Sequence, residues 1–62
     1  MEQWLATAVG KMHINGISNK ELAVKLGYSQ QYTSEILNGR KKPKGVRERV
    51  LSAIDEIISD RT

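Results

Sequence analysis

Two helix signals stand one residue apart in the middle of the chain. Gly27 is a helix-ending residue for the segment 19–26, and Ser29 is a good N-cap for the segment 30–37. Only Tyr28 separates the two signals. So short a link forces the second helix to cross the first sharply instead of returning beside it as an antiparallel hairpin. A tight pair of short helices is therefore the feature around which the rest of the chain must fold.

A capping box is expected to start the first helix of this pair. Ser18 is placed to accept a hydrogen bond from the Glu21 amide, and the Glu21 carboxylate is placed to return to the Ser18 amide. An earlier helix is predicted over residues 2–14, where Leu5, Ala8, Val9 and Met12 follow helical spacing.

A further helix is predicted over residues 46–59, after the basic loop 39–45 that contains Pro43. Its wide apolar stripe consists of Val46, Val50, Leu51, Ile54, Ile57 and Ile58. The stripe is wider than one small helical neighbour covers, so Leu51, Ile54, Ile57 and Ile58 are candidate dimer or partner residues. No strand pattern, internal repeat or low-complexity tract is present, and the fold class expected is all-α with four to five helices.

Length and composition limit the chain to one domain over residues 1–62, because so short a chain buries only about 60% of its unfolded surface. It has no cysteine, so disulfides and thiolate metal sites are excluded. The single histidine, His13, forms no metal site or catalytic dyad alone, and a position on the surface or at the core edge is expected. We therefore predict no enzyme, no cofactor and no metal. No apolar run approaches a membrane span and no signal-peptide pattern is present, so a cytoplasmic location is expected.

The net charge of +3 comes from one segment. Residues 40–49 hold six lysines and arginines against the single acid Glu48, whereas residues 1–39 are neutral and residues 50–62 are net acidic. A solvated surface loop and a contact with a polyanion both explain such a segment.

The helix expected over residues 30–37 has one polar and one apolar face. Gln30, Gln31, Ser34, Glu35 and Asn38 fall within one arc, and the opposite side carries Tyr32, Thr33, Ile36 and Leu37. The polar arc holds amides and hydroxyls without lysine or arginine, unlike an ordinary solvated face. Glutamine amides match the hydrogen-bonding edges of base pairs, and the alternative is a face that contacts only water.

The start of the helix at residue 46 lacks a Ser, Thr, Asp or Asn cap. Lys44 and Arg47 lie near the positive end of its dipole, where cations are unfavourable. A bound phosphate is expected to satisfy the free amides and both side chains.

Residues 18–39 resemble the helix-turn-helix of the lambda-repressor-like, Cro-type family of phage and bacterial regulators. The resemblance lies in Ala23 at the helix crossing, Gly27 in the turn, Gln30-Gln31 at the start of the second helix, Ile36 within it, and Asn38-Gly39 at its end. Thr33 departs from the Val or Ile usual in the family, and the family's fifth helix is not evident.

The resemblance implies a helix-turn-helix over residues 19–38 whose recognition helix, 30–37, enters the major groove. The residues it assigns to base edges are Gln30, Gln31, Ser34 and Glu35. Together with the charge pattern, it places the DNA-backbone contacts at Asn19, Ser29, Tyr32, Asn38, Arg40, Lys41, Lys42, Lys44 and Arg47.

The function expected from these features is binding of double-stranded DNA by a Cro-like repressor that occupies a pseudo-palindromic operator. A homodimer, weak or assisted by DNA, would double the contacts of one helix-turn-helix. The alternative is an antitoxin-like or adaptor subunit that acts only with a protein partner, such as a second regulatory protein. 

Overall fold

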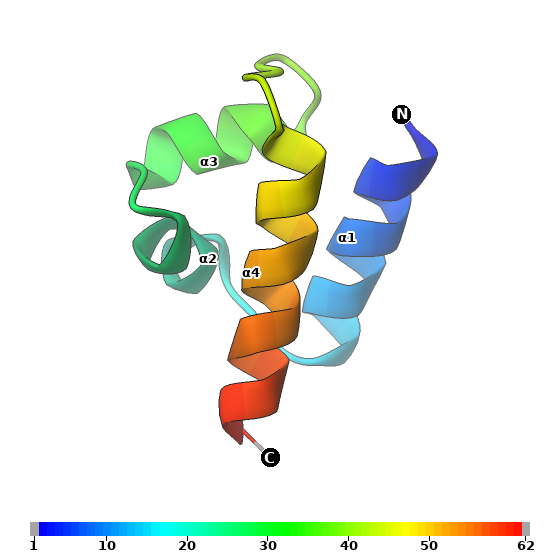
Figure 1. Ribbon diagram of the computed structural model, residues 1–62, viewed down its shortest axis with the longest axis vertical. Helices are drawn as coiled ribbons and strands as arrows, with labels where there is room; N and C mark the ends of the chain where they lie inside the picture. Colours follow the sequence, from blue (N-terminus) through cyan, green and yellow to red (C-terminus); the bar gives the residue numbers. More distant parts are fainter. Residues whose placement is uncertain (1, 62) are drawn as a thin grey trace.

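The computed structural model describes residues 2–61, which contain four helices and no strand. They are α1 (Gln3–Ile14), α2 (Asn19–Leu26), α3 (Gln30–Leu37) and α4 (Val46–Arg61). α1 and α4 lie side by side, α2 packs against the other flank of α4, and α3 packs against α2 (Figure 1). The all-helical class is confirmed. α4 continues two residues beyond the predicted end at residue 59, and α1 starts one residue later than predicted.

Serine caps start both short helices. The Ser18 hydroxyl accepts a hydrogen bond from the Glu21 amide, and the Ser29 hydroxyl accepts one from the Tyr32 amide, each at 3.1 Å. The second bond of the expected capping box is not made, because the Glu21 carboxylate pairs with Arg61 of α4 instead. The serine cap alone therefore fixes where α2 begins.

The link between α2 and α3 depends on a left-handed glycine. Gly27 has φ of 78°, and its amide donates to the Ala23 carbonyl oxygen at 2.9 Å. The Tyr28 amide donates to the same oxygen at 3.0 Å. This closure satisfies the last carbonyls of α2 and turns the chain so that α3 crosses α2 steeply (Figure 1).

All four helices contribute to one core. Its most deeply buried large side chains are Leu5, Leu22, Ile36, Val50 and Ile54. Ile54 is 0% exposed and Ile57 is 6% exposed, so these two residues face the chain's own core. The prediction that Ile54 and Ile57 form a dimer or partner surface is therefore wrong, because α1 and α2 cover this side of α4. Leu51 and Ile58 are half-buried and pack against the core edge.

Thr33 is the only buried polar residue in the described part of the chain, at 0% exposure. Its hydroxyl donates to the Ser29 carbonyl oxygen at 3.0 Å. Threonine is therefore tolerated in the core of α3, because its hydroxyl is satisfied within the helix.

Exposed ion pairs connect the C-terminal half of α4 to α1 and α2. They are Lys11–Asp55 at 3.2 Å, Lys25–Asp60 at 3.7 Å and Glu21–Arg61. Arg61 also donates to the backbone oxygen of Asn15. Each exposed pair adds at most about 1 kcal/mol, so packing supplies most of the stability and the pairs restrain the end of α4. Within residues 2–61, no helix has both the length and the apolar character needed to cross a membrane.

Candidate nucleic-acid interface

α3 presents a polar face away from the core. Gln30 and Gln31 in its first turn are exposed, and Ser34 and Glu35 in its second turn are half-buried. Asn38, directly after the helix, is exposed. The opposite side of α3 is buried through Thr33, Ile36 and Leu37. The two faces therefore separate as the helical projection predicts.

An arginine on α4 supports the turn that positions α3. The Arg49 guanidinium lies 5.1 Å from the centroid of the Tyr28 ring and donates to the Leu26 carbonyl oxygen at 3.3 Å. The Tyr28 and Tyr32 rings meet edge to face, with centroids 5.0 Å apart. Sequence reasoning counted Arg49 only among the basic residues and missed this role, although the spacing of the two tyrosines was visible. Arg49 therefore contributes to the position of α3 within the protein.

Two lysines of the basic loop pair with acids of the same chain. Lys41 lies 3.9 Å from a Glu35 carboxylate oxygen, and Lys42 lies 2.8 Å from one of Glu2. The backbone amide of Arg40 donates to the Glu35 carbonyl oxygen at 2.9 Å. The Glu35 carboxylate is therefore drawn toward the loop.

The acid at the start of α1 is held in its ionised form. Glu2 accepts hydrogen bonds from Lys42 and, at 3.0 Å, from the indole nitrogen of Trp4. The bond from Lys42 and then the bond from Trp4 lower the pKa of the Glu2 carboxyl below its ordinary value. Glu2 thus holds Lys42 against α1.

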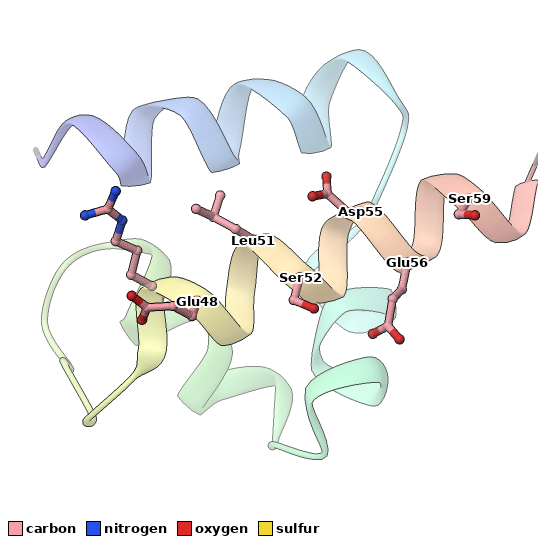
Figure 2. A pocket seen from close by; sticks show the side chains of 7 residues that line it. Glu48, Leu51, Ser52, Asp55, Glu56 and Ser59 are labelled. Carbon is pink, nitrogen blue, oxygen red and sulfur yellow. The ribbon is translucent and has the colours of Figure 1, made fainter.

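Arg47 lies apart from the polar face of α3. Together with Leu51 of α4 it lines a shallow groove whose other wall is α1, including Trp4 and Thr7. Figure 2 shows Leu51 and Asp55 on the side of α4 that faces α1. Because Val46 and Val50 are turned into the core, Arg47 faces α1. Arg47, a predicted DNA-backbone contact, therefore lies on the α1 side of α4.

Two hollows that share Asn38 as a lining residue, here together called the α1–α3 trough, lie beside α3. One part, of about 310 Å³, is lined by Val9, Met12, His13, Ile17, Asn19, Ser34, Leu37 and Asn38. The adjoining part is lined by Glu2, Leu5, Asn38, Gly39 and Lys42. Asn38 belongs to both parts. The trough therefore brings together four residues that the sequence assigned to DNA contacts, namely Asn19, Ser34, Asn38 and Lys42.

Positive charge is concentrated in the loop after α3, and acids are spaced along α4. Arg40 and Lys44 are exposed in the loop that joins α3 to α4. The exposed acids of α4 are Glu48, Asp55, Glu56 and Asp60, of which Asp55 pairs with Lys11 and Asp60 with Lys25. Three of these acids are visible along the helix in Figure 2. Glu48 in the first turn of α4 offsets part of the positive end of its helix dipole.

Comparisons with protein-family models, curated proteins and solved structures found no match to this chain. The candidate interface is therefore defined by its residues: the exposed face of α3, the adjoining trough, and the two exposed cations Arg40 and Lys44. 

Proposed function

We propose that this chain binds double-stranded DNA sequence-specifically, with α3 in the major groove, and regulates transcription. The observation that carries the proposal is the exposed face of α3, where Gln30 and Gln31 stand in the first turn with their amides free of the core. A glutamine amide can bond to both N6 and N7 of adenine, and the major groove is wide enough to admit an α-helix.

The surroundings of α3 support the same function. Asn19, Ser34 and Asn38 border the helix on its α1 side and offer neutral hydrogen-bond donors for a sugar-phosphate strand. Arg40 and Lys44 follow α3 in the loop and supply positive charge beside it. This separation of neutral base-contacting groups from charged backbone-contacting groups is typical of protein–DNA interfaces.

Repression by occupying operator DNA is the regulatory outcome that we propose. Two copies on a pseudo-palindromic site would place two α3 helices about one helical turn apart. With Ile54 and Ile57 buried in the core, the half-buried Leu51 and Ile58 are the remaining residues of the predicted α4 surface. Pairing of two copies therefore has little apolar area on α4, which favours a dimer that forms on the DNA.

Fluorescence anisotropy tests the proposal. Sites selected from a random DNA pool, and fragments flanking the gene, are titrated with the parent, Gln31→Ala and Lys44→Gln. Gln31→Ala should lose about five- to 150-fold in discrimination between the selected and scrambled sites, as one bidentate base contact predicts. Lys44→Gln should weaken binding to every sequence. It should also reduce the salt slope, that is, the slope of log affinity against log salt concentration, by about 0.9 in magnitude.

Matched control variants separate the loss of a DNA contact from a general effect of removing an amide or a positive charge. Gln3→Ala removes an exposed amide from α1, and Lys11→Gln removes a cation that pairs with Asp55 on the α4 side. Both controls should bind DNA like the parent. If the folded parent binds no DNA, or if the controls lose as much affinity as Gln31→Ala and Lys44→Gln, α3 is not the DNA-contacting surface.

A further inference from the structure

The single histidine of the chain lies in the α1–α3 trough. His13 is exposed on α1, and its side chain lines the trough together with Asn19 and Ser34. Lys42 lies in the adjoining part. The proposed function, on which this inference rests, leaves His13 without a role.

With α3 in the major groove, as proposed above, a DNA strand would pass over this trough. Ser34 and Asn38 belong both to the polar face of α3 and to the wall of the trough. A duplex that receives α3 in its major groove therefore passes one of its two sugar-phosphate strands over the trough. The imidazole of His13 would then lie beside the strand, on the side opposite α3.

The electrostatics of the trough favour a phosphate there. Its wall near His13 contains no acid, and the polar partners from α2 and α3 are Asn19, Ser34 and Asn38. The acid in the adjoining part, Glu2, is already bonded to Lys42 and Trp4. A phosphate at this position would therefore meet hydrogen-bond donors and, when the imidazole is protonated, a positive charge.

Two charged groups next to the trough residues form ion pairs with other parts of the chain. Lys11, two residues earlier on α1, pairs with Asp55 of α4, and Glu35 on α3 pairs with Lys41. Lys20 follows Asn19 at the start of α2 and is exposed. Histidine is the side chain that ordinarily changes charge between about pH 5 and pH 8.

We propose that His13 is a proton-dependent phosphate contact in the α1–α3 trough, so that the chain binds DNA more tightly at mildly acidic pH. Protonation adds one cationic contact to the strand, and DNA binding in turn takes up a proton at His13. The linkage has a definite sign: affinity rises as the pH falls through the titration range of histidine and levels off below it.

DNA titrations between about pH 5.5 and pH 8 at fixed ionic strength test the proposal. The parent should gain about two- to fivefold in affinity on acidification, the range expected of one exposed ionic contact. Its salt slope should become steeper by at most about 0.9, for one additional phosphate contact.

Two variants of His13 make the test specific. His13→Gln should bind DNA at every pH as the parent does at pH 8, whereas His13→Lys should bind as tightly at pH 8 as the parent does at pH 5.5. His13 is exposed, so both variants should keep the parent's circular dichroism spectrum. A parent affinity that does not change with pH, or an unchanged pH dependence in His13→Gln, overturns the role of His13 while DNA binding stands. Absence of DNA binding by all three proteins at every pH overturns the proposed function and this inference together.

Discussion

Replacing Ile54 with valine tests the assignment of the α4 stripe to the core of a single chain. Ile54 is 0% exposed, near the middle of α4. Removal of one methyl group from such a site costs about 0.5–1.5 kcal/mol. Unfolding entropy of about 2.1 cal/mol/K per residue gives roughly 130 cal/mol/K for 62 residues, so Tm should fall by about 4–12 °C.

Thermal unfolding followed by circular dichroism at two protein concentrations provides the measurement. Ile58→Val is the matched control, because it makes the same change at a half-buried position of the same helix and should lower Tm by less. The shift caused by Ile54→Val should be the same at both concentrations. Equal Tm shifts for the two variants would contradict the assignment of Ile54 to the core. A Tm for Ile54→Val that recovers toward the parent value as the protein is concentrated would show that Ile54 acts between copies of the chain, and would also refute the assignment.

Three further predictions concern the turn, the buried hydroxyl and the acid at the start of α1. Gly27→Ala should lower the free energy of unfolding, measured with urea, by about 1–2 kcal/mol, because the added Cβ has open space around it and only the left-handed φ is unfavourable. Gly27→Asn should lower it by less. Thr33→Val should change stability by less than about 1 kcal/mol, because the Ser29 carbonyl oxygen keeps its bond from the Thr33 amide; a larger loss in the same assay would contradict this account. Because the pKa of Glu2 is lowered, its pair with Lys42 stabilises the fold fully at pH values above the ordinary pKa of 4.5, and this stabilisation is lost as the pH falls through the lowered pKa. In Lys42→Met, NMR titration of the Glu2 carboxyl should show a higher pKa.

The helix boundaries near the turn were predictable because their causes are local. The Ser18 and Ser29 caps each join residues three positions apart, and the Gly27 closure joins residues four and five positions apart. Such contacts are fixed by the order of the residues, whatever the rest of the chain does. The separation of polar and apolar sides on α3 was predictable for the same reason.

The remaining features depend on how the helices pack. Glu21 satisfies the pattern of a capping box, yet its carboxylate reaches Arg61, 40 positions further along the chain. The apolar stripe on α4 indicated that Ile57 avoids water, but not which surface covers it. Arg49 belonged to a basic segment, and only the arrangement of α4 against the turn places it over Tyr28. Periodicity identifies which side of a helix is buried, whereas the partner on that side is set by tertiary contacts.

Positive charge is concentrated in the loop after α3, whereas acids alternate with paired cations along α4 and its neighbours. The uneven distribution gives the molecule an electric dipole moment as well as its net charge of +3. If the proposed DNA binding holds, the field of the nucleic acid exerts a torque on this dipole that turns the loop toward the DNA before contact. The on-rate should then exceed that of a chain with the same net charge spread evenly. Added salt should reduce this advantage by screening the orienting field at long range.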